Sequence, residues 1–260
     1  MLEINKIYNE DCLVGMQKID DKSIDCIICD LPYGTTACKW DTIIPLSDLW
    51  KQYMRIIKDD GAIVLFGQEP FSSRLRMSNL EMYRYDWIWE KQKPSNFQLM
   101  NFQCGRVHEL ISIFSKSNAC YSNGKTTMKY NPQKIKMDKP RFEKNVKICG
   151  NKTKNILHNY NGVKKDVTYY EKLPTSILHF NTVQKNKKHP TQKPVELIEY
   201  LICTYTNQDD IVLDNCIGSG TTAIACLRTK RNFIGFEINH DYCEIANNRI
   251  REEIGQNNES

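Results

Sequence analysis

The sequence has no long apolar segment and no export signal. None of its uninterrupted apolar runs approaches the ~18 residues of a membrane-spanning helix. The N-terminus does not combine a charged segment with an apolar one. The composition, with 40% hydrophobic and 26% charged residues, is ordinary for a soluble globular protein. We therefore expect a cytoplasmic protein that makes no membrane contact.

Metal-ligand spacing is also missing. The five histidines show none of the short spacings that zinc sites use. The eleven cysteines are scattered, and one C-x-x-C pair, Cys26 and Cys29, lies inside an apolar run without a second pair. Buried free thiols in a reducing compartment explain the cysteines best. The sequence therefore predicts no metal cofactor.

Charge is distributed unevenly along the chain. Residues 116–172 hold fourteen Lys or Arg and four Asp or Glu, which gives about +10, whereas the whole chain carries only +5. The remainder is therefore about −5. A basic segment of this kind indicates a polyanionic partner, although a solvated lysine-rich loop would have the same composition.

Apolar periodicity predicts an α/β fold with an insertion. Strands are expected at residues 4–8, 24–30, 62–66, 83–90, 109–115, 211–214 and 233–237, and helices at 12–19, 46–58, 71–79, 194–205, 221–229 and 240–253. Because strands alternate with helices, residues 1–115 and 181–260 should form one doubly wound, mostly parallel sheet. Periodicity fades over residues 116–180, which we expect to be an irregular inserted region.

The most informative segment is Asp30-Leu31-Pro32-Tyr33. Asp30 ends a buried strand, at the sheet edge where open α/β folds bind ligands. Its carboxylate and the Leu31 carbonyl can accept both N–H groups of an exocyclic amine, and Tyr33 can stack on a planar base. Pro32 fixes the backbone between them. The structural alternative is a capped turn over the edge of the core.

A second strand, turn and helix predict a cofactor site. Gly218 and Gly220 follow the strand at 211–214 and let the backbone approach a ligand at a helix N-terminus. The next strand ends at Glu237, where a carboxylate suits ribose hydroxyls. Ala223 occupies the third position of the dinucleotide fingerprint, so the glycines alone leave a nicotinamide cofactor open.

Three segments together resemble the beta group of amino-group DNA methyltransferases, which use S-adenosylmethionine. Residues 30–33 are similar to the catalytic (D/N/S)-P-P-(Y/F/W) motif, with Leu31 in place of the first proline. Residues 214–222 are similar to the D-P-F-x-G-S-G-T-T cofactor loop, with Asn215 and Cys216 in place of Pro and Phe. Residues 189–194, His-Pro-Thr-Gln-Lys-Pro, match a segment that the family often carries just before the cofactor strand.

The resemblance implies a Rossmann-like methyltransferase fold and a site-specific enzyme. Its activity would be transfer of a methyl group from S-adenosylmethionine to N6 of a flipped-out adenine in double-stranded DNA. The implied catalytic residues are Asp30, Leu31, Pro32 and Tyr33. The implied cofactor-binding residues are Asp11, Cys12, Thr191, Gln192, Lys193, Asp214, Gly218, Gly220, Thr221 and Glu237, with residues 191–193 near the methionine carboxylate. The insertion, as target-recognition region, should contact phosphates through Lys125, Lys129, Lys134, Lys136, Arg141 and Lys144.

Three alternatives stay open at this point. Cytosine N4 methylation is the nearest, because the same pocket chemistry serves either amine; an aspartate at position 30 favours adenine by family habit. An NAD-dependent dehydrogenase leaves residues 30–33 and the basic insertion unexplained, and a non-catalytic DNA-binding protein would not need Asp30, Tyr33 and Glu237. A homodimer and a cognate restriction nuclease are compatible with the sequence but not implied by it.

Overall fold

The computed structural model describes residues 2–34, 42–120, 126–148, 163–183 and 192–258. Its internal contacts divide the chain into two compact units, one of Met1–Asn131 with Ser176–Ser260 and one of Pro132–Thr175. The second unit has fewer residues than the predicted insertion of residues 116–180, because residues 116–131 and 176–180 belong to the first unit. Within the described ranges, no helix combines the length and apolarity needed to cross a membrane.

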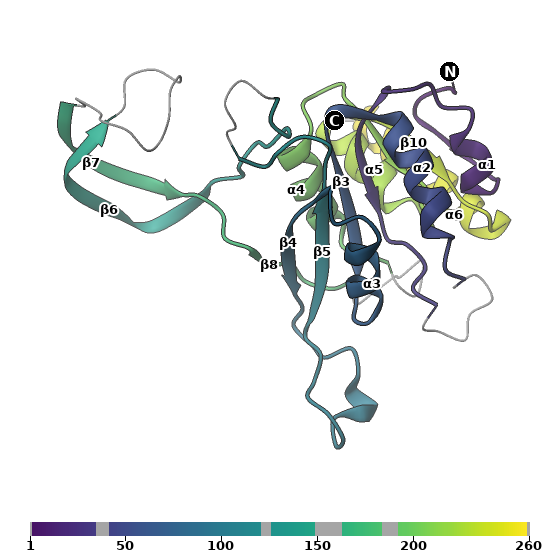
Figure 1. The fold of residues 1–260 in the computed structure, drawn as a ribbon, viewed down its shortest axis with the longest axis horizontal. Helices are drawn as coiled ribbons and strands as arrows, with labels where there is room; N and C mark the ends of the chain where they lie inside the picture. The colour runs from purple at the N-terminus through teal and green to yellow at the C-terminus, as the bar shows by residue number, and fades with distance from the viewer. Residues whose placement is uncertain (1, 35–41, 121–125, 149–162, 184–191, 259–260) are drawn as a thin grey trace. The chain divides into compact units, whose positions relative to one another are not determined.

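The described part of the first unit is built on an eight-stranded sheet in the order β1-β10-β9-β2-β3-β5-β4-β8 (Figure 1). Its strands are β1 (Lys6–Tyr8), β2 (Ile24–Cys29), β3 (Ile57–Gly67), β4 (Tyr83–Glu90), β5 (His108–Phe114), β8 (Ile177–His179), β9 (Ile211–Asp214) and β10 (Asn232–Phe236). β5 runs antiparallel to β3 and β4, and the other described pairings in this sheet are parallel. The predicted α/β, mostly parallel fold is confirmed.

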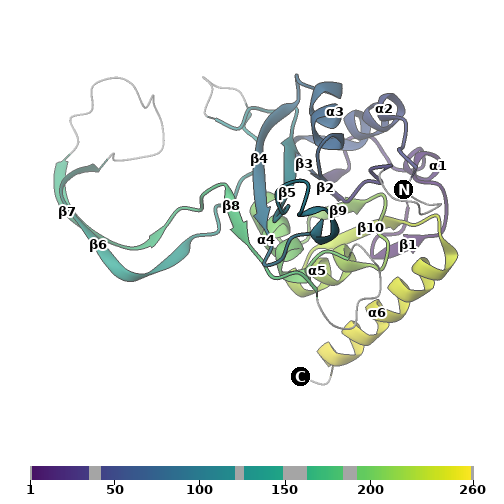
Figure 2. The same cartoon turned by 90° about the horizontal axis from the view of Figure 1, so that it is seen from below.

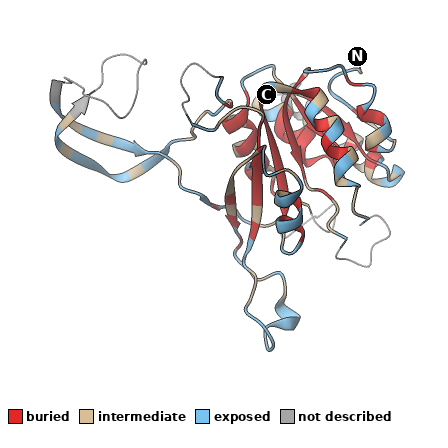
Figure 3. Cartoon of the chain, in the orientation of Figure 1, coloured by how far each residue is buried: buried red, intermediate tan, exposed pale blue. Residues whose placement is uncertain are grey.

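Helices cover both faces of this sheet (Figure 2). One face carries α1 (Cys12–Met16), α2 (Leu46–Ile56) and α3 (Phe71–Ser78), and the other carries α4 (Val195–Tyr205), α5 (Thr221–Thr229) and α6 (His240–Asn258). Each set of helices buries its apolar side chains in a separate cluster against the strands. Figure 3 colours most residues of the central strands as buried. Because the central strands are covered on both sides, they read as continuous apolar runs rather than as alternating ones.

The strand ends define one functional edge of the sheet. β2, β3, β9 and β10 are parallel to one another, so the residues that follow them, including Asp30 and Glu237, leave from the same edge. The antiparallel pairing of Glu90 with His108, and of Gly67 with Leu110, places the β4–β5 loop at that edge as well. In open α/β sheets this carboxyl edge is where ligands bind.

The second unit is a two-stranded antiparallel ribbon of β6 (Ile135–Ile148) and β7 (Val163–Lys172). The expectation of an irregular insertion was wrong for these residues. Most of the β6 side chains that the structure describes are exposed, so neither face of the strand needs the apolar alternation by which a half-buried strand is recognised.

Candidate active site

A cavity of about 1040 Å³ lies along the carboxyl edge of the sheet. It is lined both by residues 30–33, after β2, and by the loop after β9, including Gly218. Glu237, at the end of β10, belongs to the same wall. Ligand pockets commonly span ~300–1,000 Å³, so this one has room for two nucleoside-sized groups side by side.

Asp30 and Tyr33 meet directly in this cavity. The Tyr33 hydroxyl donates a hydrogen bond to Asp30 Oδ1 over 2.6 Å. The Tyr33 ring lies against Phe71, with centroids 5.0 Å apart and planes inclined by 31°. Burial, reinforced by the Asp30 charge, holds the pKa of Tyr33 well above its usual range. The phenol therefore stays protonated and keeps donating to the carboxylate.

Lys193 binds the other oxygen of Asp30. Its ammonium group pairs with Asp30 Oδ2 and lies 3.4 Å from a carboxylate oxygen of Glu109. It also lies 5.1 Å from the centroid of the Phe66 ring, a cation–π distance. Burial alone lowers the pKa of Lys193, but the two carboxylates outweigh it and hold the pKa above its ordinary value. The lysine is therefore a fixed cation beside Asp30.

Glu109 extends this arrangement into a chain of alternating charges. It accepts a hydrogen bond from Lys91 Nζ over 2.6 Å, and both side chains are nearly buried. Burial raises the pKa of Glu109, but Lys193 and Lys91 outweigh this effect and bring it below the ordinary value. The four side chains Lys91, Glu109, Lys193 and Asp30 thus form one buried ionic network that ends at the catalytic candidate.

The loop after β9 is organised by Asp214. Its Oδ2 accepts the Thr222 hydroxyl at 2.5 Å and its Oδ1 accepts the Cys216 N–H at 3.1 Å. Burial raises the pKa of Asp214 to about 7, although these two hydrogen bonds act in the opposite direction. Asn215, which replaces a proline of the family motif, is buried and accepts a hydrogen bond from the Tyr53 hydroxyl. This loop is therefore held in shape by side chains of β9, α5 and α2 together with its own Asn215.

Glu237 is joined to the same loop. Its Oε2 accepts the Gly218 N–H at 2.9 Å, and its Oε1 accepts the Asn239 N–H at 2.8 Å. Burial raises the pKa of this carboxyl despite both hydrogen bonds. Since an ionised carboxylate offers about four acceptor positions, Glu237 keeps capacity for ligand hydroxyl groups.

Gly220, which was predicted to bind the cofactor, lies at a contact between α5 and α6. It does not line the cavity, whereas Gly218, Ser219 and Thr221 do. Its φ is +82°, and an added Cβ would lie 2.8 Å from the Cβ of Ala246 on α6. Glycine is therefore required here by backbone conformation and by helix packing rather than by ligand approach.

Most of the other predicted cofactor-binding residues line the cavity, and one lies outside the described residues. Asp11, Cys12 and Gln192 line the cavity. Asp11 also caps α1, since its Oδ1 accepts the N–H of Leu13 at 2.8 Å. Thr191 lies outside the described residues, as does Lys125 of the predicted DNA-binding set.

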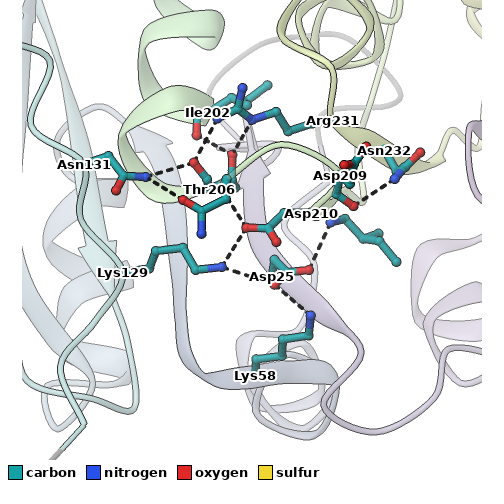
Figure 4. A network of polar contacts seen from close by, with 12 residues as sticks. Asp25, Lys58, Lys129, Asn131, Ile202, Thr206, Asp209, Asp210, Arg231 and Asn232 are labelled. Atoms are coloured by element: carbon teal, nitrogen blue, oxygen red, sulfur yellow. Dashed lines mark hydrogen bonds and ion pairs between the residues drawn. The ribbon is translucent and has the colours of Figure 1, made fainter.

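Lys129 forms ion pairs with two aspartates of the first unit (Figure 4). Its ammonium donates to Asp210 Oδ2 at 2.6 Å and to Asp25 Oδ1 at 3.4 Å, and its side chain is 16% exposed. The Asp210 and Asp25 charges hold its pKa above the ordinary value, against the effect of burial. Asp25 also accepts from Lys58 at 2.7 Å. The prediction that Lys129 contacts phosphate was therefore wrong, because two carboxylates already hold its ammonium group.

The remaining basic residues of the predicted set lie on or beside β6. Lys134, Lys136, Arg141 and Lys144 are all exposed. Arg141 pairs with Glu143 at 2.6 Å and stands over the ring of Tyr169, and Lys134 lies 3.5 Å from Glu171. Exposed pairs of this kind are weak, so these cations remain available to a polyanion.

Two site residues, Glu109 and Lys91, were missed by the sequence reasoning. Glu109 is the one acidic residue of the mostly apolar strand β5, and this was the available signal, because an acid is almost never buried without a partner. Nothing in the sequence around Lys91 distinguishes it from the exposed lysines nearby.

A family model described as DNA methylase, covering N6 and N4 methyltransferases, matches residues 24–248. The Type II methyltransferase M1.MboII of Moraxella bovis is 29% identical over 95% of this chain and 96% of its own length. The DNA adenine methyltransferase YhdJ of Escherichia coli K12 is 26% identical over 95% of this chain and 83% of its own. Among solved structures, M1.HpyAVI in complex with SAM aligns with a TM-score of 0.59 and 25% identity, covering 94% of this chain and 98% of that one.

The sheet and its cavity define a Rossmann-like α/β protein that binds ligands across the carboxyl ends of its parallel strands. The family match covers most of the sequence, including the segments that follow β2, β9 and β10. The chain belongs to the DNA methylase family.

Proposed function

We propose that this chain transfers a methyl group from S-adenosylmethionine to the N6 amino group of adenine in duplex DNA. The observation that carries the proposal is the single cavity shared by residues 30–33 and by Gly218 and Glu237. A base and a cofactor bound in one cavity can react, whereas two separate pockets would not allow transfer. An aspartate at position 30 and the similarity to an adenine methyltransferase both support adenine over cytosine.

The residues around the β9 and β10 ends fit the cofactor. Glu237 retains acceptor positions for the ribose hydroxyls, and Cys12 and Ile217 offer apolar wall to an adenine ring. Gly218 brings the backbone to the cavity without a side chain. The bound cofactor would supply a sulfonium methyl group, which is already an activated electrophile.

At the β2 end, this chain's groups act on the base. Asp30 and the Leu31 carbonyl accept the two amino hydrogens, which favours a pyramidal nitrogen with a localised lone pair. The Asp30 carboxylate stabilises the positive charge that develops on that nitrogen and can accept the proton that leaves it. Tyr33 is available to stack on the extruded base, and stacking offsets much of the cost of flipping, a few kcal/mol.

The decisive experiment is methyl transfer with isotope-labelled cofactor. The purified chain is incubated with unmodified bacterial DNA, and the product is digested to nucleosides and separated. N6-methyladenine is the expected product. N4-methylcytosine would redirect the proposal to the other amine, and absence of label from DNA would overturn it. Sequencing the modified positions then gives the recognition site.

Replacing Glu237 with alanine is expected to weaken cofactor binding by ~10–100-fold, the effect of losing hydrogen bonds to a charged acceptor. Binding is measured by titration calorimetry with S-adenosylmethionine. Glu244→Ala is the matched control, because Glu244 is an exposed glutamate on α6. Equal affinities for the Glu237 and Glu244 variants would contradict the ribose-binding role.

The ribbon is expected to contribute phosphate contacts that depend on salt. Each contact adds about 0.9 to the slope of log affinity against log salt concentration. Changing Lys134, Lys136, Arg141 and Lys144 to glutamine should reduce that slope by roughly 2–4, measured by fluorescence anisotropy with duplex DNA. The control changes four exposed lysines of the first unit, Lys6, Lys18, Lys22 and Lys51. If the control variant loses more slope than the ribbon variant, the phosphate contacts come from the first unit and the prediction for the ribbon is wrong.

A further inference from the structure

The loop between β4 and β5, residues 91–107, is an ordered projection that the mechanism above does not use. It is drawn at the lower edge of Figure 1 and is largely exposed in Figure 3. At its base the Lys91 N–H donates to the Val107 carbonyl at 2.7 Å, and further out the Ser95 N–H donates to the Arg106 carbonyl at 2.9 Å. We call residues 91–107 the β4–β5 loop.

Side chains tie the two arms of this loop together. Asn96 Nδ2 donates to the Cys104 carbonyl at 3.0 Å, and Asn96 Oδ1 accepts the Arg106 N–H at 2.6 Å. The Arg106 guanidinium donates to Gln68 Oε1 at 2.6 Å, which fastens the loop to the segment after β3. The loop therefore has a built stem, and its tip is presented in a defined way.

The tip of the loop consists largely of exposed apolar side chains. Phe97 is 78% exposed and Phe102 is 88% exposed, and Leu99 and Met100 between them are each nearly half exposed. Water contact with four large apolar groups is unfavourable, and an apolar patch of this kind on a soluble protein marks an interaction site.

The first arm of the loop forms part of the cavity wall. Lys93, Pro94 and Ser95, in its first arm, line the cavity that also contains Asp30 and Tyr33. The strand register independently places the loop at the carboxyl edge of the sheet. Any duplex that delivers a base to this cavity must therefore come close to the loop.

The polar composition of the loop identifies the kind of partner. Residues 91–107 contain no acidic residue; Lys91 is buried against Glu109, whereas Lys93 is exposed and Arg106 is partly exposed. Gln98, Asn101 and Gln103 are exposed, and their amides can bond to base edges and phosphates. A loop with exposed apolar and amide side chains and no negative charge suits a polyanion whose interior consists of flat apolar groups. Duplex DNA is such a polyanion.

We propose that the β4–β5 loop is a wedge that inserts Phe97 or Phe102 into the DNA base stack beside the extruded nucleotide. This inference rests on the proposed function and adds to it the group that takes the vacated place. Apolar side chains inserted between base steps are a general means of unstacking DNA. The aromatic ring would replace the stacking that the flipped base gives up, and so hold the flipped state open while Asp30 engages the amine.

The test compares methyl transfer on paired and weakened targets. Once the recognition site is mapped, single-turnover transfer is measured on a duplex oligonucleotide and on the same duplex with an abasic position opposite the target base. Changing both Phe97 and Phe102 to alanine should lower the rate by ~10–100-fold on the normal duplex. On the abasic duplex, where flipping costs less, the loss should shrink to within ~3-fold.

Two controls separate a wedge from general damage. Phe97→Tyr with Phe102→Tyr keeps an aromatic ring at both positions and should retain most of the wild-type rate. Met77→Ala with Leu80→Ala removes two exposed apolar side chains from the α3 region and should leave the rate unchanged. Cofactor affinity, measured by calorimetry, should be the same in all variants, because neither phenylalanine lines the cavity.

Several outcomes would overturn the wedge while leaving the proposed function intact. One is an active wild type with an equally active alanine variant, and another is a loss of equal size on paired and abasic DNA. A third is a wild-type dimer that becomes a monomer in the alanine variant by light scattering, which would make a second copy the occupant of the tip. If the wild type modifies no DNA at all, the proposed function fails first and the wedge fails with it.

Discussion

Replacing Asp30 with alanine is expected to lower the rate of methyl transfer by roughly 10³-fold while the cofactor still binds. The carboxylate is the charged acceptor for the amine, and such a group contributes ~10²–10⁴-fold as a general base or as an electrostatic stabiliser. Cofactor affinity should change little, because the residues proposed to hold the ribose follow β9 and β10, not β2. The measurements are single-turnover transfer to DNA and calorimetry with S-adenosylmethionine.

Asp30→Asn separates the hydrogen bond from the charge. The amide keeps one acceptor oxygen for the amine but has no negative charge, so its loss of rate should be smaller than that of alanine. Thermal unfolding provides the folding control, because removing Asp30 takes one of two carboxylates from Lys193. A folded alanine variant that loses cofactor binding, or that keeps its rate, would show that Asp30 does not act on the base.

The parts of the fold that the sequence predicted are those with local signals. β2 is apolar except for Asp25 and is followed by Asp30, and β9 is apolar up to its last residue, Asp214, so strand, tip and loop could be located from adjacent residues. β3 is longer than predicted, because Ile57 pairs with Ile24 before the polar Lys-Asp-Asp-Gly segment. That segment predicts a turn, and in the structure it forms an irregularity within β3, between the pairs Ile57–Ile24 and Ala62–Cys26.

The parts that were not predicted depend on contacts between distant residues. β8 has only three residues and exists because it pairs with β4, about 90 positions earlier in the chain. Lys129 was assigned to DNA from the charge of its segment, yet the fold brings it to Asp25 and Asp210. Gly220 was assigned from a loop pattern, whereas a Cβ at this position would meet Ala246 on α6. No local pattern could distinguish these pairings from their alternatives.

Lys193 is the residue for which the sequence and the structure suggest different roles. The resemblance placed it near the methionine carboxylate of the cofactor. In the structure its ammonium group is taken by Asp30 and by Glu109, which is itself paired with Lys91. A lysine held between the nearly buried Glu109 and the partly buried Asp30 is constrained in position, and its charge fixes the orientation of Asp30. We therefore expect it to act as a positioning residue for the base-binding carboxylate.

Lys193→Met should lower the rate of transfer by ~100-fold and leave cofactor affinity within ~3-fold of the wild type. Methionine keeps an apolar side chain of similar length but removes the cation, so Asp30 loses its charged partner and the contact of the ammonium group with the Phe66 ring is lost as well. If Lys193 instead binds the methionine carboxylate, cofactor affinity falls and the rate at saturating cofactor is largely kept. Calorimetry and single-turnover transfer therefore distinguish the two roles in one variant.

The matched control is Lys91→Met, which removes the other lysine bound to Glu109 and leaves the Lys193–Asp30 pair in place. Both variants break a buried ion pair, so both should lose stability, by about 3–5 kcal/mol where the remaining charge is left uncompensated. The Lys193 variant alone should lose transfer out of proportion to its stability. Parallel losses of rate in the two lysine variants would mean that the network supports the fold only, and that Asp30 is oriented without it.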